Sequence, residues 1–192
     1  MRTFATRLGL AVFALGALSA CAGTATVQPA NITSDYYTGI VQYIASRGGL
    51  PTEVSGNPFA SSDGQVHATV RDTMAKSHFG LHFPFLAEKP QGFSSPYRMV
   101  VVLDSTAIPA YHKLCADAGL RGGATKADGG EVRVAAALCT GDSMVSGTAG
   151  RVSGVRGPDD PGFITLIAQV THELFPRTDE HDDREPKEII VP

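Results

Sequence analysis

The run Tyr97–Leu103 (Y-R-M-V-V-V-L) constrains the fold of this chain more than any other segment. Its apolar residues follow one another instead of alternating with polar ones. A continuous apolar run of this length predicts a strand that is buried on both faces. Such a strand lies inside a sheet that other elements cover, so the run indicates a layered domain of helices and strands.

Helical spacing of apolar residues and helix boundary residues recur along the rest of the chain. Asp160 before Pro161, for example, is a typical helix start. Helices are predicted after Ser34, from Ser62 or Asp63, over Thr106–Ala118 and from Pro161 to Pro176. Further strands are predicted over Glu53–Phe59 and Glu131–Cys139, with residues 146–157 as a weak edge strand or a loop. The expected fold is an α/β or α+β sandwich, with a small sheet of three or four strands packed with about four helices.

Residues 78–96 form a long connection without a regular apolar period, and such connections tend to be functional. Phenylalanines are concentrated in it, and the candidate binding surface consists of Phe79, Phe83, Phe85 and Phe93. Exposed aromatic side chains mark contact surfaces, which makes this connection the best candidate for binding. The alternative is that the phenylalanines fill the core beneath it.

The first residues have the features of an export signal. Arg2 and Arg7 supply positive charge, and the uncharged apolar run Leu8–Leu18 is too short to span a bilayer. The sequence Leu18-Ser19-Ala20-Cys21 then resembles the lipobox of bacterial lipoprotein precursors. That resemblance implies that Cys21 is acylated and begins the mature chain. The alternative is an ordinary secretory signal that is cleaved after an alanine.

The same resemblance predicts a cellular location for the protein. In bacteria with two membranes, an Asp directly after the lipidated cysteine tends to keep a lipoprotein in the inner membrane. Here Ala22 occupies that position. We therefore expect a lipid-anchored envelope protein, on the outer membrane and facing the periplasm if the source has one. The expected organisation is a lipoprotein signal peptide over residues 1–21, a tether over 22–32, one globular domain over 33–176, and a charged flexible tail over 177–192.

Charge and cysteine content narrow the function further. The net charge of −3 gives no basic footprint for nucleic acid, so the expected partners are the membrane, through the lipid on Cys21, and an envelope protein. Once Cys21 is lipidated, Cys115 and Cys139 remain as a pair, which predicts a disulfide in an oxidising compartment. Two buried free thiols are the alternative, and the absence of C-x-x-C spacing argues against a metal or redox role.

One short motif suggests catalysis. Gly141-Asp142-Ser143-Met144 follows a predicted strand and resembles the GDSL motif of lipases and esterases, while Cys139 to Ser143 faintly resembles the C-x-G-D-S of trypsin-like proteases. A serine nucleophile needs a histidine base, and the nearest downstream pattern, Asp179-Glu180-His181, has the wrong spacing. The alternative is a turn with no catalytic role.

No metal or cofactor site is predicted. His78 and His82 have helical metal-ligand spacing, but Gly80 between them and Pro84 after them disfavour a helix. No glycine-rich nucleotide loop is present. The leading hypothesis is therefore a non-catalytic accessory or protein-interaction lipoprotein. The alternatives are a small serine hydrolase that uses Ser143 and a carrier of a small apolar ligand, which would need a cavity lined by the phenylalanines.

Overall fold

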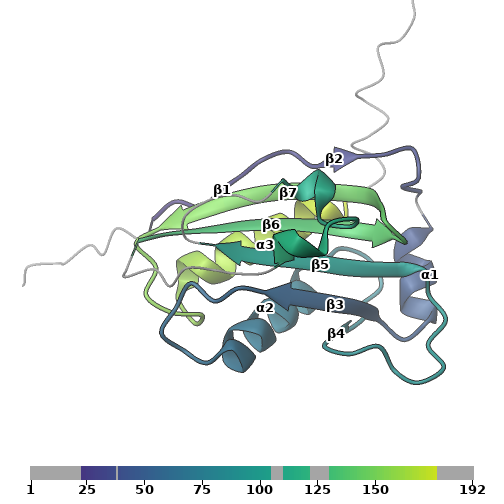
Figure 1. Ribbon diagram of the computed structural model, residues 1–192, viewed down its shortest axis with the longest axis horizontal. Coiled ribbons are helices and arrows are strands. Elements are labelled where there is room, and N and C mark those ends of the chain that lie inside the picture. The colour runs from purple at the N-terminus through teal and green to yellow at the C-terminus, as the bar shows by residue number, and fades with distance from the viewer. Residues whose placement is uncertain (1–22, 38, 105–109, 122–129, 177–192) are drawn as a thin grey trace, which may run out of the picture.

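The computed structural model describes residues 23–37, 39–104, 110–121 and 130–176 and shows a seven-stranded mixed sheet with α-helices on one face (Figure 1). The strands are β1 (Thr26–Val27), β2 (Asn31–Ile32), β3 (Leu50–Ser55), β4 (Phe85–Leu86), β5 (Tyr97–Asp104), β6 (Glu131–Thr140) and β7 (Ser143–Ser153). The helices are α1 (Ile40–Ser46), α2 (Asp63–Ser77) and α3 (Pro161–Leu174), with short 3₁₀ turns η1 (Tyr111–Lys113) and η2 (Ala118–Arg121).

The sheet order is β1-β7-β6-β5-β3-β4, and β2 also pairs with β7. β5, β6 and β7 are antiparallel neighbours, whereas β3 runs parallel to both β5 and β4. The predicted run Tyr97–Leu103 forms β5, and its Met99–Leu103 portion is buried on both faces, as the sequence indicates. It lies between β6 and β3, inside the sheet.

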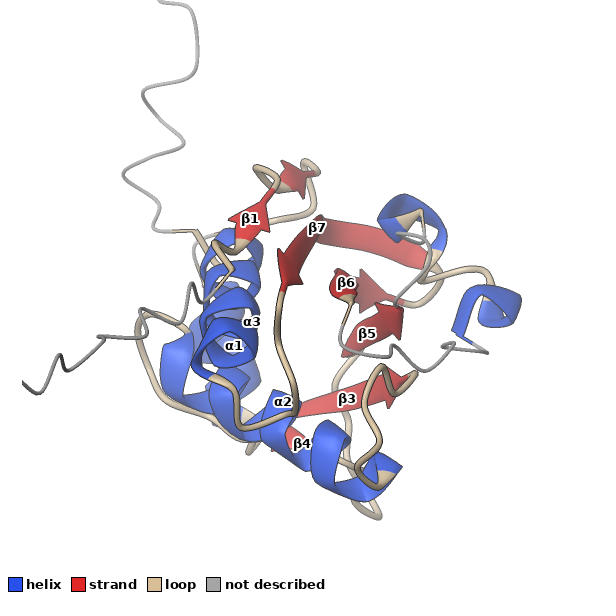
Figure 2. Ribbon diagram, turned by 90° about the vertical axis from the view of Figure 1, so that its left-hand side faces the viewer, coloured by secondary structure: helices blue, strands red, loops and turns tan. Residues whose placement is uncertain are grey.

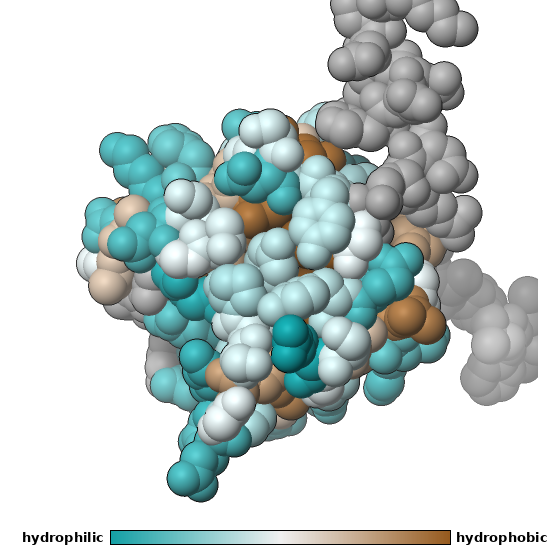
Figure 3. Space-filling model, turned by 90° about the vertical axis from the view of Figure 1, so that its right-hand side faces the viewer, coloured by the Kyte–Doolittle hydropathy of each residue, from teal (hydrophilic) through white to brown (hydrophobic). Residues whose placement is uncertain are grey.

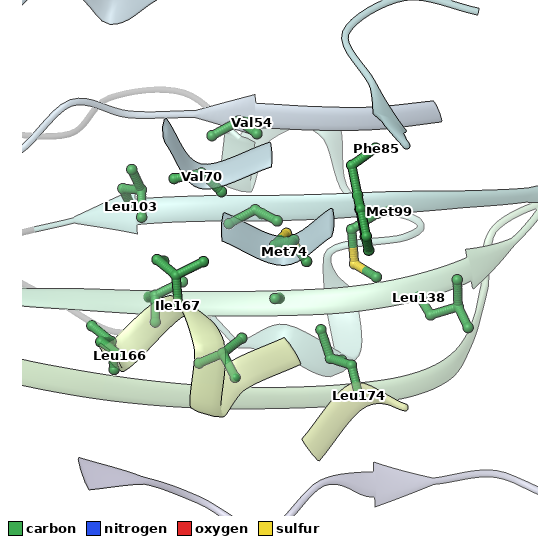
Figure 4. Packing of buried hydrophobic residues seen from close by; sticks show 14 of the residues in the cluster. Val54, Val70, Met74, Phe85, Met99, Leu103, Leu138, Leu166, Ile167 and Leu174 are labelled. Carbon is green, nitrogen blue, oxygen red and sulfur yellow. The ribbon is translucent and has the colours of Figure 1, made fainter. Parts of the chain in front are cut away.

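The three helices cover the same face of the sheet (Figure 2). Two of them begin where the sequence predicts. The Ser62 hydroxyl accepts a hydrogen bond from the Gln65 amide at the start of α2, and the Asp160 carboxylate accepts one from the Gly162 amide at the start of α3. The large apolar side chains of these helices and of the sheet interlock in one core (Figure 4).

The opposite face of the sheet is built differently. Its buried residues are mostly small or β-branched, and they pack under the irregular segment 110–121. These residues are Val100, Val102, Ala135, Ala137, Cys139 and Ala149, with Leu114 and Cys115 from the covering segment. A disulfide between Cys115 and Cys139 ties this segment to β6, which confirms the predicted pairing.

The predicted fold class is wrong in the size of its sheet and in its helix count. The sheet has seven strands instead of three or four, and the described residues contain three α-helices instead of about four. The three strands beyond four are β1, β2 and β4, each of two residues. The predicted strength of β7 also differs, because its glycine- and serine-rich sequence has low intrinsic strand propensity. Long pairing with β6 overrides that propensity, so residues predicted as a weak edge or loop form the longest strand.

Two further segments differ from expectation. Part of the predicted tether belongs to the sheet, since β1 and β2 pair with β7. The predicted helix Thr106–Ala118 is absent from its described part, where residues 110–118 form only 3₁₀ and other turns. The predicted signal peptide, with Cys21, and the predicted tail after Pro176 lie outside the described residues.

Candidate functional site: a tyrosine-lined end of the sheet

Tyrosines gather at the end of the molecule where β5 begins. Tyr97 is the first residue of β5, and its ring meets the ring of Tyr43 from α1 edge to face, with 5.7 Å between the ring centroids. The guanidinium carbon of Arg47 lies over the Tyr43 ring, 5.0 Å from the ring centroid. Figure 3 shows this end, where pale and teal side chains surround smaller brown patches.

Tyr37 completes the exposed part of this group. It is 46% exposed, one of two large hydrophobic residues that stand out from the described surface. Burial raises the pKa of Tyr97, and a hydrogen bond with the Tyr37 side chain raises it further. Burial alone raises the pKa of Tyr36 to about 12. The phenols of Tyr36 and Tyr97 are therefore neutral at physiological pH. We call Tyr37, Tyr43, Tyr97 and Arg47 the tyrosine surface.

A cleft of about 570 Å³ adjoins the tyrosine surface. It is lined by the first half of β3, the residues just after β4, the start of β5 and the turn between β6 and β7, and Tyr97 belongs to both the cleft and the tyrosine surface. Arg98 holds one wall together, because its guanidinium donates hydrogen bonds to the carbonyl oxygens of Gly141 and Cys115. Lys89 is a second cation in the lining and is exposed.

The predicted phenylalanine surface does not form as one exposed patch. Phe83 and Phe85 are 4% and 6% exposed and belong to the core, which is the alternative that the sequence left open. Phe79 is half-buried and stacks on His172, with 4.5 Å between the ring centroids. Phe93 is also half-buried. Among the described residues, the exposed aromatic side chain is instead Tyr37.

His78 and His82, whose spacing suggests a pair of metal ligands, lie among aromatic side chains. His78 is 3% exposed and stacks on Phe83 with 4.2 Å between the ring centroids, also close to Phe85 and Phe175. Burial lowers the pKa of His78, and the positive charge that His82 can carry lowers it further. Within the described ranges, no group of three or more metal-ligating side chains comes together.

Ser143 occupies a tight hairpin. It pairs with Thr140 across the turn Gly141-Asp142, where Gly141 has a φ of +55°, and its side chain is exposed. In the part of the chain that the structure describes, no histidine forms a hydrogen bond with its hydroxyl, and His181 lies outside that part. The local geometry is that of a turn, which is the alternative to a nucleophile.

Two observations bear on the cellular location. The Cys115–Cys139 disulfide is compatible with an envelope or periplasmic protein, because thiols are kept reduced in the cytosol. None of the helices in the described ranges is both long and apolar enough to cross a bilayer.

Comparison with known proteins gives a weak structural likeness only. No protein family model matches the chain, and no curated protein matches it. The chain resembles a variant of the PelC dodecamer from Paraburkholderia phytofirmans, at 16% identity over 81% of this chain and 100% of that one, with a TM-score of 0.44. A second PelC dodecamer structure matches at 15% identity over 80% and 99%, with a TM-score of 0.46. Likeness at this level assigns neither a family nor a function.

Proposed function

We propose that this protein is a lipid-anchored lipoprotein of the cell envelope that binds a partner protein and has no catalytic role. The lipobox that ends at Cys21 supports the anchor, and the tyrosine surface supports partner binding. On an outer membrane, the domain would face the periplasm. The disulfide is compatible with such a location.

The observation that carries the proposal is the position of Gly23. Gly23 lies so close to Ser153, the last residue of β7, that a Cβ on Gly23 would collide with the Ser153 carbonyl oxygen. An acylated Cys21 is only two residues away from Gly23 in the sequence. The membrane would therefore lie near the Ser153 end of β7.

The tyrosine surface lies at the other end of the same strand. Tyr97 pairs with Thr140, and Thr140 pairs with Ser143, the first residue of β7. Since a strand rises about 3.3 Å per residue, the eleven residues of β7 separate the two ends by about 30 Å. A protein anchored at Cys21 would thus present the tyrosine surface away from its own membrane.

The chemistry of this surface suits a protein partner. Tyrosine and arginine are enriched where binding energy concentrates in protein interfaces, because they combine a large apolar area with polar groups. The T-shaped contact between Tyr43 and Tyr97 and the Arg47 guanidinium above Tyr43 hold these side chains in place before binding. Preordered side chains lose less entropy when a partner docks.

Cys21→Ala tests the anchor. We expect the wild-type chain to incorporate an alkyne-labelled fatty acid in cells and to sediment with membranes, and the Cys21→Ala chain to do neither. Ser19→Ala, which keeps the cysteine, is the matched control and should behave as wild type. Fatty-acid incorporation by Cys21→Ala, or membrane association that does not depend on Cys21, would contradict the proposal.

A further inference from the structure

The segment that follows α2 closes on itself around one histidine ring. His78 is the first residue after α2 and is 3% exposed. The Phe83 amide donates a hydrogen bond to Nε2 of this ring, and Nδ1 lies 3.4 Å from the Phe79 carbonyl oxygen. The imidazole thus joins the two ends of the turn between Phe79 and Phe83. We call residues 78–84 the histidine loop.

The two contacts of the ring fit its neutral form only. Since Nε2 accepts from the Phe83 amide, the neutral ring carries its proton on Nδ1 and donates it to the Phe79 carbonyl oxygen. An imidazolium carries a proton on both nitrogens, so Nε2 would meet the Phe83 amide as a second donor. Protonation of His78 therefore breaks this contact and leaves a buried donor without an acceptor.

The ring of His78 is also surrounded by apolar side chains. It stacks on Phe83 and lies near Phe85 and Phe175, and burial among them lowers its pKa below the ordinary 6.5. A charge at this place costs free energy because water is excluded. Stacking of a cation on the Phe83 ring offsets part of that cost.

Few titratable groups face this ring. His82 of the same loop is the nearest, with 5.5 Å between the ring centroids, and its positive charge further lowers the pKa of His78. From α3, His172 stacks on Phe79. Among the described residues, no carboxylate forms an ion pair with His78 that would hold an imidazolium in place.

The histidine loop braces α1, the helix that carries part of the tyrosine surface. At one end, the Pro84 carbonyl oxygen accepts a hydrogen bond from the Leu50 amide, shortly after α1. Near the start of α1, Val41 lies against Gly80, where an added Cβ would be 3.4 Å from Cγ1 of Val41. Opening of the loop would remove both supports.

We propose that the histidine loop is a pH-operated brace of the tyrosine surface, in which protonation of His78 opens the loop and loosens α1. Partner binding at the tyrosine surface would then be strongest near neutral pH and weaker in acid. What the brace regulates rests on the partner-binding function above. Opening of the loop itself involves neither a partner nor the lipid anchor.

Proton linkage limits the size of the effect. In an open, hydrated loop His78 takes up its proton with the ordinary pKa of 6.5, and in the closed loop it does so only at lower pH. Opening is therefore favoured as the pH falls below 6.5. Between about pH 7.5 and about pH 5.0, one proton raises the population of the open loop by at most about thirtyfold.

Amide hydrogen exchange of the purified full chain at these two pH values tests the proposal. After correction for the intrinsic pH dependence of exchange, the Phe83 and Leu50 amides and those of α1 should lose at least about fivefold in protection at the lower pH. Amides of β6, inside the sheet, should keep their protection, which separates loop opening from unfolding of the whole domain.

His78→Gln removes the titrating ring and keeps a side-chain oxygen that can accept from the Phe83 amide. In this variant we expect the same amides to be protected equally at both pH values. His67→Gln is the matched control, because His67 is a half-buried histidine of α2 whose Nε2 contacts the Gly56 carbonyl oxygen. It should respond to pH as the wild type does. His78→Phe, which keeps an aromatic ring, replaces His78→Gln if that variant does not fold.

Three results would overturn the proposal. The first is equal protection of the loop and α1 at both pH values in the wild type. The second is a pH response that persists in the folded His78 variant, and the third is an equal loss of protection in β6. In each case, the anchor at Cys21 and partner capture at the tyrosine surface could still be demonstrated near neutral pH.

Discussion

The two faces of the sheet are built on different principles. Along β6, Val134, Ala136 and Leu138 point to the face with the helices, and Ala135 and Ala137 point to the other. On the helix side, large side chains such as Met74, Leu166 and Ile167 fill the space between sheet and helices (Figure 4). On the other side, small side chains let an irregular backbone segment lie close, and a disulfide ties it down.

This difference teaches where stability comes from. Full burial of a large apolar side chain contributes about 1.5–3 kcal/mol, so the helix face holds its layer through buried area. An alanine buries much less, so the other face gains little from area. On that face, the disulfide between Cys115 and Cys139 stabilises the folded state, because it restricts the conformations of the unfolded chain.

The largest effect is expected on the helix face. Phe163 is fully buried, and its ring packs edge to face on Phe59 with 5.0 Å between the ring centroids. Phe163→Ala should lower the free energy of unfolding by about 3–5 kcal/mol, through lost burial and the cavity left behind. Urea unfolding followed by circular dichroism measures it. A loss below about 1 kcal/mol would show that α3 is not held by this face.

Removing the disulfide should have the next largest effect. Cys115 and Cys139 are 24 residues apart, and the double variant Cys115→Ser/Cys139→Ser should lose about 3 kcal/mol of stability. Hydrogen exchange should rise first in residues 110–121 and leave α3 protected under mild conditions. Treating the wild type with a reductant is the control and should give the same pattern. Equal loosening of both faces would contradict the comparison.

Close packing on the sheet face that lies under residues 110–121 predicts a smaller loss of stability. A Cβ on Gly147 would lie 2.8 Å from Cδ2 of Tyr111 and 2.5 Å from Sδ of Met144. Gly147→Ala should therefore cost about 1–3 kcal/mol by thermal unfolding. Gly157→Ala, where a Cβ meets nothing within 4 Å, is the matched control and should be near neutral. The cost of Gly147→Ala should fall in a Tyr111→Ala background, and an unchanged cost would rule out this contact as its cause.

The smallest expected effect is the pH dependence of stability that His78 contributes, at the edge of the helix face. Burial among Phe83, Phe85 and Phe175 lowers the pKa of His78 below its ordinary value of 6.5, and His82 on the same segment lowers it further. The unfolded chain then takes up the proton first, so stability should fall as the pH drops below about 6.5.

His78→Leu isolates this contribution. Unfolding measured at several pH values should show a weaker loss of stability below about pH 6.5 for His78→Leu than for the wild type. His67→Leu, a half-buried position on α2, is a control. Parallel pH profiles for the wild type and His78→Leu would contradict the assignment.

Sequence patterns predicted the parts of this molecule that local chemistry determines. The run that forms β5, the starts of α2 and α3 and the Cys115–Cys139 disulfide all follow from neighbouring residues or cysteine parity. β7 was predicted only as a weak edge strand or a loop over residues 146–157, because residues such as Gly147 and Gly150 have no strand preference of their own. Their place in the sheet is fixed by pairing with β6.

The candidate site was missed for a related reason. Tyr37 and Tyr43 belong to the segment around α1, and Tyr97 is more than fifty positions further along the chain. The sheet brings them together, and no local pattern marks that contact. The phenylalanines of residues 78–96 predict a binding surface because they are neighbours in the sequence, yet Phe83 and Phe85 are buried. Their closeness in the sequence indicates that these phenylalanines cluster in space, but it does not show whether the cluster is buried or exposed.

Photo-crosslinking in cells tests the central claim most directly, namely that a chain anchored at Cys21 presents the tyrosine surface to a partner. A photoreactive amino acid would replace Tyr37 or Tyr97, with exposed Arg156, near the Ser153 end, as the control position. The account predicts one defined envelope protein captured from Tyr37 and Tyr97, not from Arg156, and lost in Cys21→Ala. Equal capture from Arg156, or no capture from either tyrosine position while the protein is anchored, would contradict it.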